Sequence, residues 1–141
     1  MRQLFRLLKP GGLMVCEEPV VDSLYSEPPT DGYNRCPQLV HALSATRKVD
    51  YSGGRRLHTW AAEAGFEIVD MRAYQPHYVT GPHKGFWSWT MEAAGPSLVA
   101  DAILTEEDLS RVLSAMRAAD GDPGVMVAGY RNHQLIARRP C

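Results

Sequence analysis

Charge of one sign, long apolar runs and cysteine are all scarce in this sequence of 141 residues. Lys and Arg number 15 against 16 Asp and Glu, and no Lys/Arg run exceeds two, so a nucleic-acid-binding surface is not predicted. No segment reaches the length that spans a bilayer, and the start, MRQLFRLLKPGG, has too short an apolar stretch for a signal sequence. We therefore expect a cytoplasmic protein that binds neither nucleic acid nor a membrane.

Cysteine and histidine give little support for a disulfide framework or a metal site. Cys16, Cys36 and Cys141 are odd in number and widely spaced, which is typical of reduced thiols. His77 and His83 lie six residues apart, but no third ligand, H-E-x-x-H motif or cysteine pair accompanies them. We predict no disulfide and no metal site.

Along its length, the sequence alternates between helical and strand-like segments. Met1 to Leu8 resembles the end of a helix, terminated by Lys-Pro-Gly-Gly. Leu13 to Cys16 is a short continuous apolar run, which is typical of a strand covered on both faces. Leu57 to Ala64 has the apolar spacing of a helix, Gly65 is placed to cap it, and Phe66 to Met71 predicts a second strand. Such transitions are typical of α/β folds.

Residues 19–50 form the first of two longer segments within this alternation. Pro19 to Tyr33 is rich in Pro, Asp, Ser and Tyr, so we expect a loop there, followed by a helix from Pro37 to Arg47. Long loops in small domains are usually functional. We interpret residues 19–50 as a lid-like segment.

Residues 81–120 form the second longer segment, which we predict to be a helical insertion in two parts. Gly95-Pro96 would separate the parts, and Thr105 would be the N-cap of the second. The turn DGDPG follows, and VMVAGYRNHQLIARR predicts one broken strand or two short ones.

Three stretches in this order resemble the class I S-adenosylmethionine-dependent methyltransferases that act on small molecules. Arg6 to Leu13 resembles their R-x-L-K-P-G-G-x segment, which joins a helix to the fifth strand of a seven-stranded sheet. Arg56 to Phe66 is similar to the following helix and sixth strand, and Ala137 to Pro140 to the end of the chain after an antiparallel seventh strand.

The resemblance covers residues 1–141 but only the carboxyl-terminal half of the family's domain. It implies a partial Rossmann-like α/β fold in which the fifth, sixth and antiparallel seventh strands form a small mixed sheet, with the seventh strand in the middle. S-adenosylmethionine is the implied cofactor. The family binds it at a glycine-rich turn after the first strand, and Gly11-Gly12 precedes a strand while Gly53-Gly54 lacks a third glycine. We expect the isolated chain to be inactive and its cofactor binding to be weak or absent.

Without the preceding strand of the family's sheet, the strand at residues 13–16 has an apolar, unpaired edge. Proteins usually cover such edges. We therefore expect a second copy or an amino-terminal partner at the edge of residues 13–16, or a longer reading frame that supplies the missing half.

Candidate site residues follow from the rule that open α/β sheets bind ligands beyond the carboxyl ends of their strands. Glu17, Glu18 and the loop through Tyr25 would then lie near the substrate. Glu17 is a candidate base and Glu18 and Tyr25 are candidate substrate contacts, although both glutamates fit solvated loop positions as well. His41 is a second candidate base, or simply a half-buried helical side chain.

Aromatic residues gather at Phe86, Trp87 and Trp89. They either wall an apolar substrate pocket, with Trp87 facing the substrate, or pack the core of the inserted helices. Arg55 and Arg56, at a helix start, either hold an anionic group or are solvated.

Two functions therefore remain. The first is methyl transfer from S-adenosylmethionine to an oxygen, nitrogen or carbon of a small molecule, with this chain as the substrate-side half. The second is a non-enzymatic, methyltransferase-like module for binding or dimerisation. An unrelated α+β domain with similar turns is a further possibility, because fold does not determine function.

Overall fold

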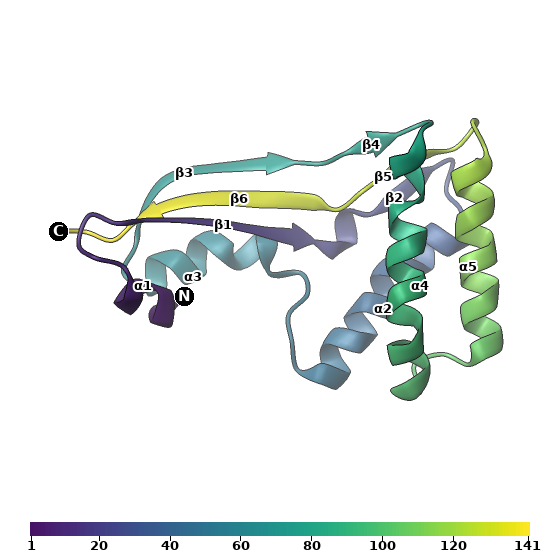
Figure 1. Cartoon of the computed structure of the whole chain (residues 1–141), viewed down its shortest axis with the longest axis horizontal. Helices are drawn as coiled ribbons and strands as arrows, with labels where there is room; N and C mark the ends of the chain where they lie inside the picture. The colour runs from purple at the N-terminus through teal and green to yellow at the C-terminus, as the bar shows by residue number, and fades with distance from the viewer. The chain divides into compact units, whose positions relative to one another are not determined.

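The last strand of the chain lies in the middle of a three-stranded sheet. In the computed structural model, which describes residues 1–141, β6 (Arg131–Arg138) lies between β1 (Leu13–Val20) and β3 (Glu67–Tyr74) and is antiparallel to both (Figure 1). β1 and β3 therefore run parallel to each other. The expected strand order is found, but the sheet is not mixed, because both neighbouring pairs are antiparallel.

The chain divides into two units, which are described separately. Unit 1 comprises residues 1–20, 52–74 and 131–141, and unit 2 comprises residues 21–51 and 75–130. The chain as a whole is a mixed α/β protein with five α-helices and two small antiparallel sheets. None of the helices has the length and apolarity needed to cross a bilayer.

Unit 1 packs helices on one face of its sheet. These are α1 (Arg2–Leu7), α3 (Leu57–Glu63) and the 3-10 turn η2 (Gly53–Arg56), and Figure 1 shows α1 and α3 on the same side. Its core consists of six buried residues: Met14, Leu57, Ala61, Phe66, Leu135 and Ala137. The expectation that the first strand is covered on both faces is wrong, because Leu13 is 54% and Val15 73% exposed on the other face.

Two glycine turns connect the elements of unit 1 as predicted. Gly11 has a φ of 78° in the turn between α1 and β1, and Gly65 has a φ of 96° after α3. Both values lie in the left-handed region that glycine adopts without steric cost. The Phe5 ring packs against Gly65 and makes an edge contact with Phe66, with ring centroids 5.0 Å apart.

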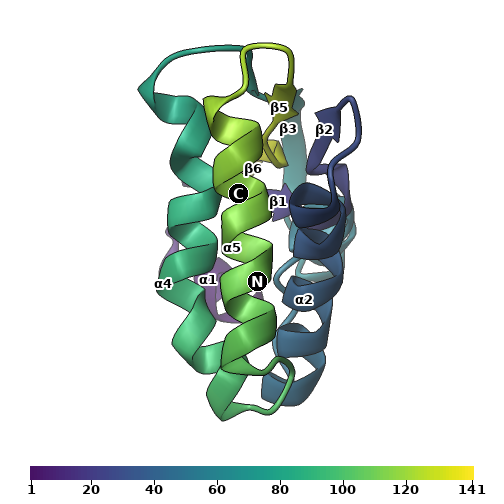
Figure 2. The ribbon, with the colours of Figure 1, turned by 90° about the vertical axis from the view of Figure 1, so that its right-hand side faces the viewer.

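Unit 2 combines three helices with a second small sheet. The helices are α2 (Asp31–Arg47), α4 (Phe86–Ala100) and α5 (Glu106–Gly121), which Figure 2 shows side by side. The sheet has the order β2 (Tyr25–Glu27), β5 (Met126–Ala128), β4 (His77–Tyr78). Two 3-10 turns, η1 (Val21–Ser23) and η3 (Pro82–Gly85), complete it.

The prediction of a loop from Pro19 to Tyr33 is wrong. β1 continues to Val20, η1 and β2 follow, and α2 begins at Asp31, six residues before the predicted start at Pro37. Pro19 is tolerated within β1 because an edge strand needs no N–H on its free side. Pro37 lies within α2, where its missing N–H leaves one helical hydrogen bond unmade.

The helical insertion is also divided at a different place from that predicted. α4 continues through Gly95 and Pro96, and the break falls at residues 101–105. Gly95 lies directly against Leu109 of α5, since an added Cβ would be 2.6 Å from the Leu109 Cδ2. Close packing of the two helices therefore accounts for the glycine. Thr105 is the N-cap of α5, as predicted, because its Oγ1 accepts a hydrogen bond from the Asp108 N–H at 3.1 Å.

Candidate functional site

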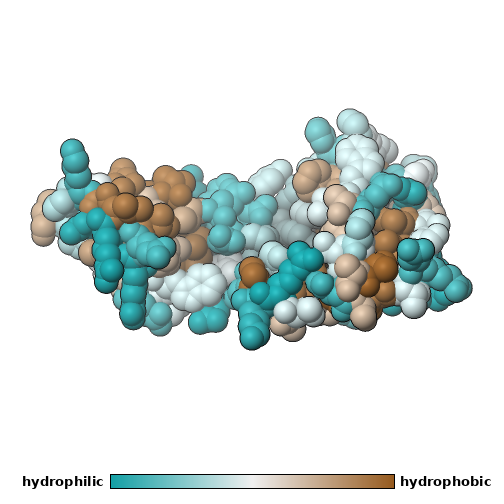
Figure 3. Space-filling model, turned by 60° about the horizontal axis from the view of Figure 1, so that its bottom comes forward, coloured by the Kyte–Doolittle hydropathy of each residue, from teal (hydrophilic) through white to brown (hydrophobic).

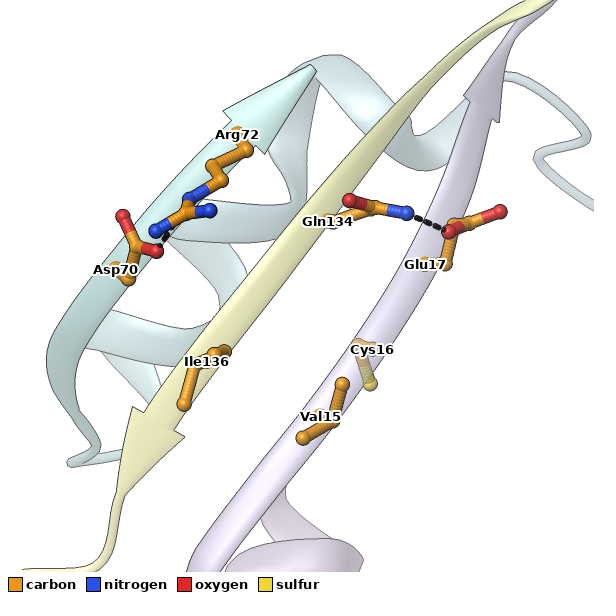
Figure 4. A pocket seen from close by; sticks show the side chains of 7 residues that line it. All are labelled: Val15, Cys16, Glu17, Asp70, Arg72, Gln134 and Ile136. Atoms are coloured by element: carbon orange, nitrogen blue, oxygen red, sulfur yellow. Dashed lines mark hydrogen bonds and ion pairs between the residues drawn. The ribbon is translucent and has the colours of Figure 1, made fainter. Parts of the chain in front are cut away.

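The two predicted glutamates lie within β1 and not in a loop beyond it. Glu17 is on the open face of the unit 1 sheet, where its carboxylate accepts a hydrogen bond from the Gln134 side-chain amide (Figure 4). Glu18 points to the opposite face, next to Gly53 of η2. Because neighbouring residues of a strand face opposite sides, Glu17 and Glu18 do not form one site.

A shallow hollow of about 330 Å³ lies on this open face. Figure 4 shows that its side chains come from all three strands: Val15, Cys16, Glu17, Asp70, Arg72, Gln134 and Ile136. The polar members are paired with one another, since Arg72 Nε donates to Asp70 at 2.7 Å. The Cys16 thiol itself packs against the core on the other face, where burial, followed by the nearby Glu18 carboxylate, raises its pKa and disfavours the nucleophilic thiolate. The hollow is therefore better suited to contact than to catalysis.

His41 is part of a side-chain pair that brings α2 and η1 together. Its Nε2 lies 2.6 Å from Asp22 Oδ1, and the two side chains are 45% and 41% exposed. A carboxylate on one ring nitrogen fixes the imidazole ring and leaves the other nitrogen, Nδ1, to exchange a proton with a substrate. This pair is the arrangement in unit 2 that best fits acid–base chemistry. No local sequence signal indicates Asp22, which lies 19 residues from His41.

Tyr25 and Trp87 occupy different environments within unit 2. Tyr25 is exposed on β2, with its hydroxyl 3.4 Å from the His77 Nε2. Trp87 on α4 packs on Tyr130, with ring centroids 4.1 Å apart, and its buried indole N–H has no hydrogen-bond partner.

The aromatic residues of α4 therefore do not act as one group. Trp87 packs against the core of unit 2, whereas Phe86 is 49% and Trp89 57% exposed. The core interpretation holds for Trp87 alone. His77 contacts Tyr25 and His83 contacts Tyr78, and no three His, Cys, Asp or Glu side chains are grouped as metal ligands.

A buried polar network, which sequence reasoning missed, joins the three helices of unit 2. The Tyr33 hydroxyl donates to Asp120 Oδ1 at 2.6 Å, and the Ser88 hydroxyl donates to Asp120 Oδ2 at 2.5 Å. Burial and the hydrogen bond to Asp120 raise the pKa of Tyr33 well above its usual range. Tyr33 therefore stays neutral, and the network fastens α2 and α4 to the end of α5.

A second hollow, of about 350 Å³, lies between α2 and α5 of unit 2. Arg35 and Gln38 line it from α2, and Arg111 lines it from α5. Arg111 already pairs with Glu107 at 3.1 Å and Asp108 at 3.3 Å on its own helix. No catalytic arrangement follows from these contacts.

The chain was compared with known proteins. No protein-family model matches it, and no curated protein shows a significant match.

Proposed function

We propose that the chain is the substrate-side half of an S-adenosylmethionine-dependent methyltransferase domain that acts on a small molecule. The observation that supports this proposal most is the strand order β1-β6-β3, in which the last strand of the chain is antiparallel between two strands that are parallel to each other. The partial Rossmann-like sheet proposed from the sequence, with fifth, seventh and sixth strands in that order, has this arrangement. The Lys-Pro-Gly-Gly turn and the Gly65 turn occur at the two joints where the resemblance requires them.

The residues present do not fit a binding site for S-adenosylmethionine. β1 is followed by η1, which contains no glycine, and not by a glycine-rich turn into a helix. Gly54 is used for packing, because an added Cβ would lie 2.6 Å from the Glu18 carbonyl oxygen and 2.8 Å from that of Pro19. In this proposal the cofactor site would belong to an amino-terminal half outside residues 1–141.

The proposed contribution of this chain to the reaction is proton removal by His41. A hydroxyl or amine is a better methyl acceptor once it gives up its proton, and the Nδ1 of His41 is available to accept one. Asp22, 2.6 Å from the Nε2 of His41, would orient the ring. Positioning of the substrate would supply most of the remaining rate enhancement.

The test begins with the coding sequence upstream of Met1. If it extends the reading frame by a half-domain, the extended protein should bind S-adenosylmethionine in calorimetry and transfer a labelled methyl group to members of a panel of phenols and amines. The isolated chain should show no micromolar binding. Tight binding by the isolated chain, or none by the extended protein, would contradict the proposal.

Within the extended protein, His41→Gln should lower kcat by a factor of ~10²–10⁴, the usual range for loss of a general base. Its affinity for S-adenosylmethionine should stay unchanged. The matched control is His58→Gln, since the exposed His58 contacts only its neighbour Thr59 in the hydrogen bonds of the structure. Equal activities of the two variants would exclude His41 as the base.

A second candidate function is association through β1 without catalysis. β1 is an edge strand, paired with β6 on one side only, and Leu13 and Val15 are exposed on its open face. Size-exclusion chromatography with light scattering tests this function. A folded chain that remains monomeric at all concentrations would count against it.

A further inference from the structure

The backbone of β1 offers hydrogen-bonding groups at its free edge in a defined pattern. At the start of the β1–β6 ladder the Arg139 N–H donates to the Gly12 carbonyl at 2.9 Å, and the Arg139 carbonyl accepts from the Gly11 N–H at 2.8 Å, so the Gly12 carbonyl is directed toward β6. Residues directed toward the neighbouring strand alternate along an antiparallel ladder, so the even-numbered residues of β1 bond to β6. The odd-numbered residues direct their N–H and C=O groups to the free edge. They are Leu13, Val15 and Glu17, followed by Pro19, which has no N–H.

The side chains of these same residues lie on the open face of the sheet. Leu13 and Val15 are 54% and 73% exposed there, and the neighbouring Ile136 of β6 is half-buried. Figure 3 also shows apolar surface over the part of unit 1 where Figure 1 places α1 and the start of β1. An unpaired edge combined with exposed apolar side chains favours association with another strand.

Antiparallel pairing of two copies about a two-fold axis fits this pattern in few registers. Odd-numbered residues must face odd-numbered residues, because only these have free N–H and C=O groups. With Glu17 opposite itself, like charges meet directly. With Cys16 opposite itself, the two Glu17 side chains become diagonal neighbours, so their like charges repel. Leu13 then faces Pro19 of the second copy, and hydrogen bonds are lost because proline has no N–H.

The register with Val15 opposite itself avoids both problems. Leu13 then faces Glu17 of the second copy, and three pairs of residues form about six hydrogen bonds. The two Glu17 side chains lie four residues apart along the strand, which is about 13 Å. Leu13 is next to Arg138 of β6 within its own copy. Glu17 of the second copy therefore lies two strands, about 10 Å, from Arg138, within reach of these two long side chains of opposite charge.

We infer that two copies of this chain pair through β1 in this register, forming one six-stranded sheet with the order β3-β6-β1-β1-β6-β3. The inference rests on the second candidate function, association through β1, and specifies its partner and geometry. It is independent of methyl transfer. An amino-terminal half that paired with β1 would occupy the same edge, so such a half and the second copy would exclude each other.

Disulfide cross-linking tests the register in the full chain with Cys16 and Cys141 replaced by Ser. Val15→Cys should give a disulfide-linked dimer on mild oxidation, because hydrogen-bonded antiparallel pairs have Cα atoms about 5.5 Å apart, within the range of a disulfide. Leu13→Cys alone and Glu17→Cys alone should not, but a mixture of these two proteins should cross-link with each other. Efficient cross-linking of Leu13→Cys alone, or none of Val15→Cys, would overturn the register.

Analytical ultracentrifugation of the unmodified chain tests association itself. The chain should dimerise reversibly with concentration, and Val15→Asp should abolish dimerisation because two carboxylates would then face each other. Val69→Asp is the matched control, since Val69 is also exposed but lies on β3 away from the free edge of β1. Circular dichroism would show that both variants are folded. A folded monomer in every case overturns association, whereas a dimer unaffected by Val15→Asp overturns only the use of β1.

Discussion

Unit 2 should lose stability in mild alkali because of one buried thiol. Cys36 on α2 lies in the core of unit 2, 3% exposed. Burial raises the pKa of Cys36 from its ordinary value of 9.0 to about 11. A nearby hydroxyl, that of Tyr130 at 3.8 Å, opposes this shift only partly.

The sign and size of the effect follow from proton linkage. An acid whose pKa is higher in the folded state gives its full stabilisation below the unfolded pKa and loses it as the pH rises through the folded pKa. For Cys36 the loss therefore falls between pH 9.0 and about 11. Two pKa units correspond to about 3 kcal/mol, of which about 2 kcal/mol is lost by pH ~10.5.

The assay is urea unfolding in a Trp60→Phe background at pH ~8 and pH ~10.5, with a phosphine reductant. The remaining tryptophans, Trp87 and Trp89, both lie on α4, so their fluorescence reports on unit 2. Cys36→Ala should be less stable than the parent at pH ~8, because it leaves a small cavity. It should, however, lose about 2 kcal/mol less than the parent between the two pH values.

The same experiment contains its control. Cys141→Ala, at an exposed cysteine, should follow the parent at both pH values. Tyr33 and Tyr130 are buried too, and the part of their raised pKa values that comes from burial adds a loss above pH ~10 that the parent and both variants share. If Cys36→Ala showed the same alkaline loss as the parent, a buried neutral thiol would not be its source.

Two further substitutions test the packing and capping of unit 2 by thermal unfolding. Gly32→Ala should lower the free energy of unfolding by about 1–3 kcal/mol, because the added Cβ would lie 2.7 Å from the Met116 backbone nitrogen, whereas Gly121→Ala, with no atom within 4 Å, should be neutral or stabilising. A neutral Gly32→Ala would show that α2 and α5 separate easily. Thr105→Ala should cost about 1 kcal/mol through loss of the hydrogen bond to Asp108, and Thr105→Ser should restore most of it; equal losses would indicate that the cap is unimportant.

Features set by local chemistry could be predicted from the sequence. The Lys-Pro-Gly-Gly turn, the Gly65 turn and the Thr105 cap each depend on a few adjacent residues with definite backbone or hydrogen-bonding preferences. They occur where the sequence placed them. The position of the last strand in its sheet was also expected, from the resemblance and not from periodicity.

Features set by tertiary packing could not be predicted. Pro37 suggested the start of a helix and Gly95-Pro96 a break, yet both helices continue through these residues. Gly95 packs closely on Leu109 of α5, a contact that a short sequence window does not contain. The apolar run in β1 indicated burial on both faces, but an apolar residue does not specify whether a partner is present. Propensity is a weak guide wherever contacts between distant elements decide.

The candidate site, too, could be predicted only where local sequence determines it. His41 was recognisable as a residue type that can exchange protons near neutral pH, whereas its partner Asp22 depends on how η1 meets α2. The Tyr33–Asp120 hydrogen bond, between residues 87 positions apart, is further still from any local signal. Sequence reasoning therefore identified a single candidate base, and the structure supplied the carboxylate that would make it effective.

The order of segments in unit 1 makes its sheet depend on the end of the chain. β6 is the only strand that pairs with β1 and with β3, and the three strands lie on three separate segments of the chain, interrupted twice by unit 2. Leu13 pairs with Arg138, so closing the sheet requires contact between nearly opposite ends of the sequence. Such long-range pairing is slow, because the entropy of closing a large loop is lost before the contacts form. Until β6 docks, β1 has two unpaired edges, and afterwards it retains one. The edge of β1 that we infer to bind a second copy is thus the one that β6 leaves unpaired.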